Sequence, residues 1–143
     1  MKRDLGDGYE LDDDSARIDR HAVHAYLGGV SYWAKGRSRE VQDELIDGAA
    51  RVVGLYHDGV QIGFTRTLSD GHAQSYLADV YVLEEHRGRG LGVELVRFSV
   101  DEGPLASTKW FLHTEDAHDL YRTFGFSEPG PKALERWTGE PTY

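Results

Sequence analysis

The stretch from residue 76 to residue 100 constrains the fold of this chain more than any other. Tyr76 to Leu83 is mostly apolar, as in a buried strand, and it leads into the loop Arg87-Gly88-Arg89-Gly90-Leu91-Gly92 and then a helical pattern. Glycines at alternate positions leave the backbone uncovered, so consecutive N–H groups and the positive end of the following helix can face one anion. The stretch therefore predicts a phosphate cradle. The guanidinium groups of Arg87 and Arg89 beside it suit a pyrophosphate.

Spacing separates three kinds of phosphate-binding loop. A P-loop needs Gly-Lys-Ser/Thr after its glycines, whereas here Val93 and Glu94 follow Gly92. A dinucleotide-binding loop needs a glycine or alanine where Val93 stands, and an acidic residue about 20 residues further on in a βαβ unit. Both of these readings are disfavoured.

The remaining pattern, Arg87-x-x-Gly90-x-Gly92 after a strand, resembles the coenzyme A pyrophosphate loop of the GNAT superfamily of acyl-CoA N-acyltransferases. A later segment, Ala117-x-x-Leu120-Tyr121-x-x-Phe124-Gly125-Phe126, is similar to a second motif of the same superfamily. Two motifs in the right order are much harder to obtain by chance than one. The resemblance extends over residues 76–126, and before that it is only topological.

The resemblance implies that acetyl-CoA is the acyl donor. The residues it places around the coenzyme pyrophosphate are Arg87, Gly88, Arg89, Gly90, Leu91 and Gly92. It also places the thioester carbonyl against the backbone of Tyr81 and Val82, where an N–H group stabilises the developing oxyanion. Tyr121 is expected to return a proton to the departing thiolate. Many members carry Asn where this chain has Thr114, so the contacts of that Asn are not expected here.

Asp79 is a candidate general base. It interrupts an otherwise apolar strand, and a buried carboxylate is costly unless it is paired or kept for a task. In the superfamily an acidic residue in this strand often helps to deprotonate the amine, directly or through water. The structural alternative is an aspartate satisfied by nearby Tyr or Ser hydroxyls.

Tyr121 has two readings as well. It shares a helical stripe with Ala117, Leu120 and Phe124, and this periodicity alone predicts an aromatic residue of the core. Only the resemblance to the superfamily assigns it the role of a general acid.

Two aromatic residues mark an expected loop between the first helices. A helix is expected over residues 17–27 and a second near residues 39–46, with Tyr32 and Trp33 between them in a segment with turn chemistry. Exposed aromatic residues on a loop favour a binding mouth for the acceptor substrate. The alternative is that both rings fold back onto the core as a lid.

The other elements predict the fold class. Strand patterns at residues 51–56 and 61–67 flank Asp58-Gly59, a strong hairpin signal, and a further turn leads into the strand at residue 76. After the glycine loop we expect a helix, a strand over residues 108–114, a helix over 116–124 and at most one short strand near 135–137. These elements predict an α+β fold in which antiparallel strands lead into a βαβ crossover. The resemblance implies a GNAT-like arrangement, with a mixed central sheet that carries helices on both faces. We expect one domain over residues 1–143.

Charge and composition narrow the function classes. Sixteen basic residues against 25 acidic ones give a net charge of −9, which disfavours nucleic acid and favours a cationic amine acceptor, unless the charge serves solubility alone. The sequence has no cysteine, which excludes disulfides and thiolate metal sites and fits the cytoplasm. No apolar run approaches the roughly 18 residues that a bilayer requires, and no secretory signal is expected, so we predict no membrane association.

The sequence offers little for other kinds of catalysis. His21 and His24 are the only histidines at helical spacing, no carboxylate completes a metal triad with them, and no Gly-x-Ser-x-Gly motif occurs. We therefore expect no metal. The resemblance to the GNAT superfamily predicts an N-acetyltransferase that moves an acetyl group from acetyl-CoA to a primary amine of a small molecule or protein. The alternative from another class is a non-catalytic acyl-CoA-binding module. A homodimer is compatible with either.

Overall fold

The computed structural model describes residues 1–137 and 139, and it contains a six-stranded sheet. The strands are β1 (Lys2–Gly6), β2 (Tyr9–Asp12), β3 (Arg51–His57), β4 (Val60–Ser69), β5 (Gln74–Val82) and β6 (Lys109–Phe111). Their order in the sheet follows their order in the chain. Neighbouring strands are antiparallel up to β5, whereas β6 runs parallel to β5, so the sheet is mixed, as predicted.

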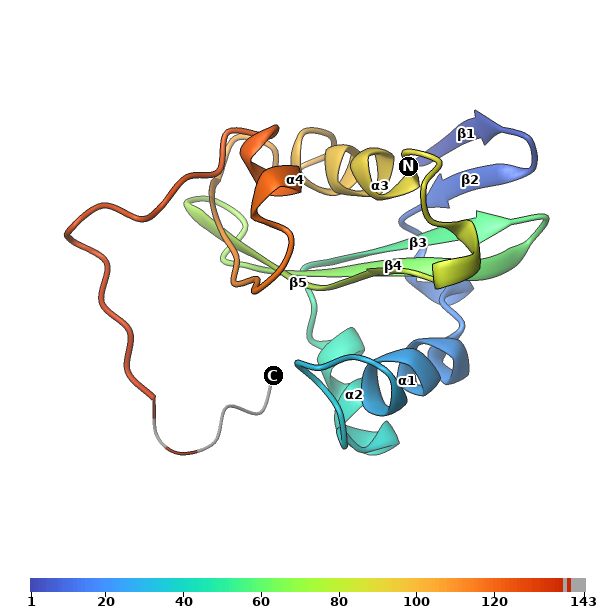
Figure 1. Ribbon diagram of the computed structural model, residues 1–143, viewed down its shortest axis with the longest axis horizontal. Helices are drawn as coiled ribbons and strands as arrows, with labels where there is room; N and C mark the ends of the chain where they lie inside the picture. Colours follow the sequence, from blue (N-terminus) through green and yellow to red (C-terminus); the bar gives the residue numbers. More distant parts are fainter. Residues whose placement is uncertain (138, 140–143) are drawn as a thin grey trace.

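Helices cover both faces of this sheet (Figure 1). The helices α1 (Arg20–Gly29) and α2 (Arg39–Asp47) lie on one face, and α3 (Leu91–Val100) and α4 (His118–Arg122) lie on the other. Two short 3₁₀ helices, η1 (Ser15–Arg17) and η2 (Glu84–His86), precede α1 and the glycine loop. The α+β fold class and the βαβ crossover from β5 through α3 to β6 are confirmed.

Local capping sets where the first helices begin. The Asp19 carboxylate accepts a hydrogen bond from the Ala22 N–H, so α1 starts three residues later than the pattern predicted, and η1 occupies the segment before it. The hydroxyl of Ser38 caps α2 in the same way, through the Val41 N–H.

The hairpins follow from residues that tolerate a positive φ. Asp58 (φ +48°) and Gly59 (φ +82°) form the predicted turn between β3 and β4. An equivalent turn at Asp7 and Gly8 joins β1 to β2. Strand β1 was not predicted, because Leu5 is its only large apolar residue and the strand lacks a hydrophobic pattern.

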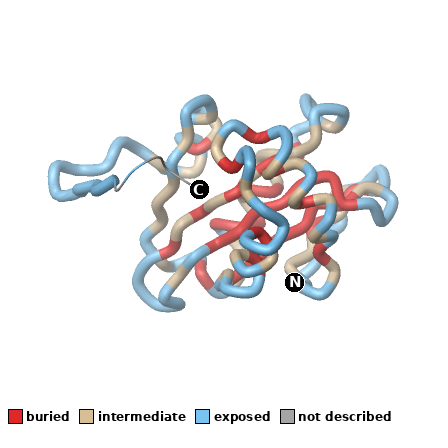
Figure 2. The backbone as a smooth tube through the Cα atoms, turned by 90° about the horizontal axis from the view of Figure 1, so that it is seen from below, coloured by how far each residue is buried: buried red, intermediate tan, exposed pale blue. Residues whose placement is uncertain are grey.

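The core consists of one apolar layer on each side of the sheet, and the buried strands run through the middle of the molecule (Figure 2). Leu55, Leu95 and Phe98 pack between the sheet and α3. On the opposite face, Leu27 and Phe64 pack in the layer beneath α1 and α2.

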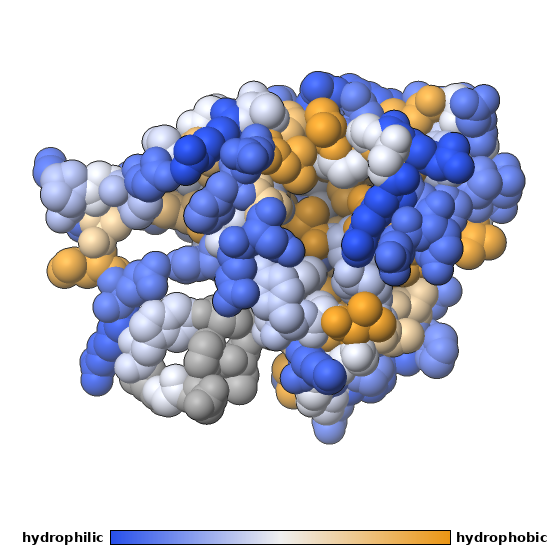
Figure 3. All heavy atoms as spheres, viewed as in Figure 1, coloured by the Kyte–Doolittle hydropathy of each residue, from blue (hydrophilic) through white to orange (hydrophobic). Residues whose placement is uncertain are grey.

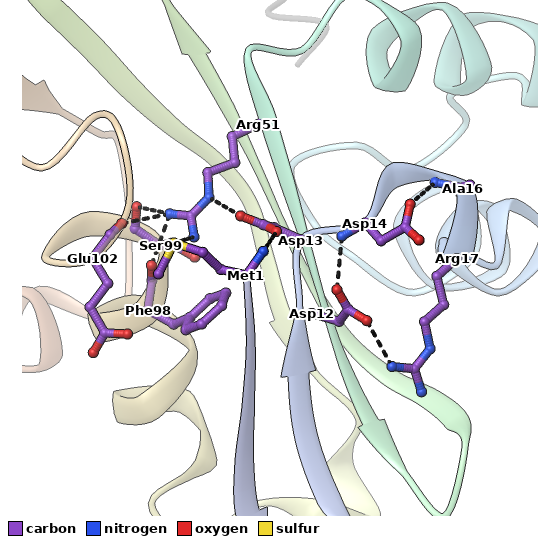
Figure 4. Close-up of polar contacts among 10 residues, drawn as sticks. All are labelled: Met1, Asp12, Asp13, Asp14, Ala16, Arg17, Arg51, Phe98, Ser99 and Glu102. Carbon is purple, nitrogen blue, oxygen red and sulfur yellow. Dashed lines mark hydrogen bonds and ion pairs between the residues drawn. The ribbon is translucent and has the colours of Figure 1, made fainter.

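Arg51 fixes α3 to the sheet (Figure 4). Its Nη1 donates to the carbonyl oxygens of Phe98 (2.9 Å), Ser99 (3.1 Å) and Glu102 (2.8 Å), while Nε donates to the Asp13 carboxylate at 3.1 Å. These carbonyls lie at the C-terminal end of α3, where a helix lacks internal partners and favours a cation. The contact holds the far end of the helix that begins at the glycine loop.

The C-terminal part differs from the expectation. The strand expected over residues 108–114 is limited to β6, and residues 135–137, where at most one short strand was expected, form none. Residues 127–137 run as an extended arm away from the body, because Pro129 and Pro131 lack the N–H groups that a sheet needs. A cavity of about 1230 Å³ lies between the arm, α4 and β6, and it is visible as open space in Figure 3.

Within the described residues, no helix combines the length and apolar character that crossing a membrane would require.

Candidate active site

The glycine loop leaves the start of α3 uncovered. Gly90 is the N-cap of α3 with φ +76°, and no side chain among the described residues caps the first turn. Gly88 also has a positive φ, of +80°. A Cβ atom added at Gly88, Gly90 or Gly92 would meet no heavy atom within 4 Å, so these glycines do not serve internal packing. The loop thus offers backbone donors and a helix N-terminus to an anion, as the residues of a pyrophosphate cradle should.

The two loop arginines have different surroundings. Arg87 folds back, because its Nε donates to the Val82 carbonyl oxygen at 2.9 Å and its Nη2 donates to the Tyr26 hydroxyl at 3.0 Å. Arg89 is exposed and forms no ion pair within the described part of the chain. Arg87 therefore ties the loop to the end of β5, and Arg89 remains available for a ligand.

The edge of β5 is open next to this loop. Parallel pairing with β6 joins only residues 74–76 to residues 109–111, so from Leu77 onward no described strand lies on the side of β5 opposite β4. An extended ligand therefore has backbone groups to bind along this edge.

Val82 presents its backbone to that edge. The Leu83 N–H donates to the Ile62 carbonyl oxygen of β4 at 2.8 Å, and successive residues of a strand direct their polar groups to opposite sides. The Val82 N–H and C=O therefore face away from β4, in agreement with the contact between its carbonyl and Arg87. Tyr81 is the other predicted backbone contact. The Tyr81 carbonyl oxygen faces β4, since it would lie 2.8 Å from a Cβ atom added at Gly63. Of these two residues, only Val82 therefore directs its backbone groups to the open edge of β5.

A β-bulge distorts β5 at Asp79. Phe64 pairs with Tyr81 and Arg66 with Ala78, so one residue of β4 faces two residues of β5. Asp79 adopts φ +56°, an uncommon value for a residue with a side chain. The bulge turns the Asp79 carboxylate toward the loop between α1 and α2.

Asp79 accepts hydrogen bonds from three donors. Its Oδ2 lies 2.9 Å from Arg37 Nη1 and 2.8 Å from Arg66 Nε, and its Oδ1 lies 3.2 Å from Trp33 Nε1. Only 1% of the side chain is exposed. The structural alternative for Asp79 invoked hydroxyl partners, and the partners are instead two guanidinium groups and an indole.

Tyr121 lies in the apolar layer above the open edge of β5. It packs in one cluster with Leu77, Val96 and Val100, and 7% of the residue is exposed. Its hydroxyl forms no hydrogen bond with any described residue. Burial raises the pKa of Tyr121 well above its ordinary value, and the nearby Asp116 and Tyr32 raise it further, so the phenol stays protonated around neutral pH.

The loop between α1 and α2 joins these elements. The Tyr32 hydroxyl donates to Asp116 Oδ1 at 3.4 Å and accepts from the Glu115 N–H at 3.2 Å. The rings of Tyr32 and Trp33 meet edge to face with centroids 5.0 Å apart, and Trp33 reaches Asp79. The tertiary structure thus connects both predicted substrate residues to the neighbourhood of Asp79 and Tyr121. Trp33 folds inward, while Tyr32 stays half exposed.

Sequence reasoning missed Arg37, Arg66 and Asp116. No local pattern marks the two arginines, because their common partner Asp79 is distant in sequence and only the sheet and the α1–α2 loop bring them together. Thr114, where many members carry Asn, accepts from the Ala117 N–H at 3.2 Å and so supports the start of α4. The described residues contain no group of three side chains suited to a metal ion, and His24 contacts the Arg37 carbonyl oxygen.

Comparison with known proteins decides the family. The sequence pattern of the Acetyltransferase (GNAT) family matches residues 12–126. The chain belongs to the GNAT acetyltransferase family. A crystal structure from Xanthomonas campestris pv. campestris, of a protein assigned to the GNAT family, superposes on this GNAT protein with a TM-score of 0.86. The two are 32% identical, and the match covers 94% of each chain.

Two further relatives agree with this assignment. A Deinococcus radiodurans R1 protein named as an acetyltransferase is 28% identical, with a TM-score of 0.69 over 94% of this chain and 92% of its own. A Gibberella zeae acetyltransferase-like protein, FG08082, is 30% identical over 71 residues, which is 48% of this chain. The match spans only 40% of that curated relative. The predicted family and the predicted fold are confirmed.

Proposed function

We propose that this GNAT protein is an N-acetyltransferase that moves an acetyl group directly from acetyl-CoA to a primary amine. One observation carries the proposal: the loop before the uncovered N-terminus of α3 contacts the open edge of β5 at Val82, and the buried Tyr121 packs against Leu77 and Val80 of the same strand. This arrangement offers donors for a pyrophosphate, an edge for an extended chain and a proton donor, in the order in which a coenzyme A thioester needs them.

Different residues serve the different steps of the proposed acetyl transfer. The first N–H groups of α3 and the Arg89 guanidinium bind the pyrophosphate, and Arg87 holds the loop against β5. The bound acetyl-CoA supplies an activated acyl group. The Val82 N–H stabilises the negative charge that develops on the carbonyl oxygen. The Tyr121 hydroxyl donates a hydrogen bond, and then a proton, to the departing sulfur.

We propose that a water molecule, and not Asp79, accepts the proton of the amine. The oxygens of Asp79 already accept three hydrogen bonds, two of them from arginines, so protonation would weaken buried ion pairs. The acceptor amine enters beside Tyr32, where Glu115 and Asp116 provide a negative rim for a cationic molecule.

A pair of substitutions at Gly92 tests the cradle. Gly92→Asp places a carboxylate in the first turn of α3, where it suits the helix dipole and meets no atom of the chain, so the protein should remain folded. The same carboxylate would repel a pyrophosphate, so the Kd for acetyl-CoA should rise at least about a hundredfold. Gly92→Ala is the matched control, and it should gain about 0.5–1 kcal/mol of stability with a much smaller effect on binding.

The measurements are calorimetric titration with acetyl-CoA and thiol release with a panel of amines. Unchanged acetyl-CoA affinity in Gly92→Asp contradicts the cradle. Tight acetyl-CoA binding by the parent without thiol release, across small amines and peptides, favours the acyl-CoA-binding module over the enzyme.

A further inference from the structure

A buried cluster beneath Trp33 carries more positive than negative charge. Arg37 and Arg66 share Asp79 as their one ion-pair partner among the described residues, so two guanidinium groups face one carboxylate. The exposed fractions of the side chains are 5% for Arg37, 8% for Arg66 and 1% for Asp79. The cluster therefore holds one positive charge in excess, away from bulk water.

Several donors in this cluster lack acceptors. Arg37 Nη2 is enclosed and has no hydrogen-bond partner within residues 1–137, and the same is true of Nε2 of the neighbouring Gln42. Arg66 uses only its Nε, and its two terminal nitrogens, which have no acceptor among the described residues, are not enclosed and can reach a ligand. Native structures leave few buried donors unpaired, because each one loses its hydration without compensation. A surplus buried cation with spare donors points to an anionic partner.

The cluster adjoins the proposed reaction centre. Asp79 and Val82 lie on the same strand, and the bulge directs Asp79 toward Trp33. The adjacent Tyr32 contacts Asp116 near the start of α4, which also carries Tyr121. An anion bound at Arg66 would therefore lie on the acceptor side of β5, separate from the glycine loop.

We propose that Arg66, supported by Arg37, binds the carboxylate of the acceptor, and that the acceptor is an amine bearing a carboxylate, such as an amino acid. This inference rests on the proposed function and specifies its substrate class. A guanidinium fork matches a carboxylate through two parallel hydrogen bonds. The surplus of one charge balances a monoanion, whereas a phosphate monoester would leave negative charge uncompensated. The negative rim at Glu115 and Asp116 suits the ammonium end of the same molecule.

Matched acceptors test the proposal in the unmodified protein. Thiol release is measured with an amino acid, its amide and the decarboxylated amine. The value of kcat/KM should be at least about tenfold higher for the amino acid, because the other two lack a charged partner for the guanidinium. Equal or higher values for the decarboxylated amine would overturn the carboxylate site while leaving the acetyltransferase proposal intact.

Binding of the product gives a readout that does not require turnover. Calorimetry compares an N-acetyl amino acid with its methylamide, which has no carboxylate. Tighter binding of the acid supports the site, and equal binding contradicts it, even where no amine is acetylated and the proposed activity itself fails.

Arg66→Gln locates the effect. The substitution leaves Arg37 and Asp79 as a balanced pair, so it removes the surplus charge without leaving an isolated one. In this variant the ratio of kcat/KM for the amino acid to that for the decarboxylated amine should fall about tenfold or more. In Arg66→Lys the same ratio should lie between the values for the parent and for Arg66→Gln. Arg20→Gln is the matched control on the surface, where Arg20 pairs with Asp47, and the ratio should not change. An unchanged ratio in Arg66→Gln would refute the assignment.

Discussion

Replacing Tyr121 with Phe separates packing from chemistry at one oxygen atom. The ring fills the cluster with Leu77, Val96 and Val100, and Phe keeps that ring. The hydroxyl has no hydrogen-bond partner among the described residues, so its removal breaks no contact. We therefore expect the free energy of unfolding to change by less than about 1 kcal/mol.

The expected loss of activity follows from the donor and the acceptor. A free thiol has a pKa near 8.5 and a tyrosine near 10, and burial raises the pKa of Tyr121 further, so the phenol is a weaker acid than the thiol. Its main contribution is then a hydrogen bond to a charged sulfur, worth about 1.5–3 kcal/mol. At about 1.4 kcal/mol for each factor of ten, Tyr121→Phe should lower kcat by about tenfold to 150-fold.

Three measurements check this expectation. Thiol release at saturating acetyl-CoA gives kcat, calorimetry gives the acetyl-CoA affinity, which should hardly change, and urea denaturation gives stability. Tyr56→Phe is a matched control, because Tyr56 is also buried, with an enclosed hydroxyl that lacks a partner, but it lies on β3 under Arg17. Full activity in Tyr121→Phe, or the same loss in Tyr56→Phe, would refute the acid role.

Two further predictions concern carboxylates. Asp79→Asn leaves two buried guanidinium groups without a counter-charge, so it should cost about 3–5 kcal/mol of stability in urea denaturation, while the pH dependence of the remaining activity should overlay that of the parent. A selective loss of rate at low pH would instead restore Asp79 as the base. The pKa of Asp70 is lowered to about 2 by the N–H groups of His72, Gln74 and Ala73, so its stabilising effect is complete above its usual pKa near 4 and is lost as the pH falls toward 2. In Asp70→Asn the urea midpoint should therefore fall less between pH 4 and pH 2 than in the parent, and an equal fall would contradict this.

Much of the fold is determined by local sequence. The Asp58-Gly59 turn, the glycine loop and the helix that follows it each depend on neighbouring residues, and the structure has all three where they were predicted. The extra strand β1 was missed because its polar sequence carries no period.

Some features of the candidate site are likewise determined by local sequence, and others only by the tertiary structure. The sequence alone predicted the cradle, since glycines at fixed spacing before a helix expose backbone donors that can face an anion. It also marked Tyr121, Asp79 and Trp33 individually. Only the tertiary structure decided which groups pair with Asp79, because its partners Arg37 and Arg66 come from a loop and a neighbouring strand. Electrostatic pairing depends on distance in space, and no periodicity along the chain encodes which charges the folded sheet will bring together.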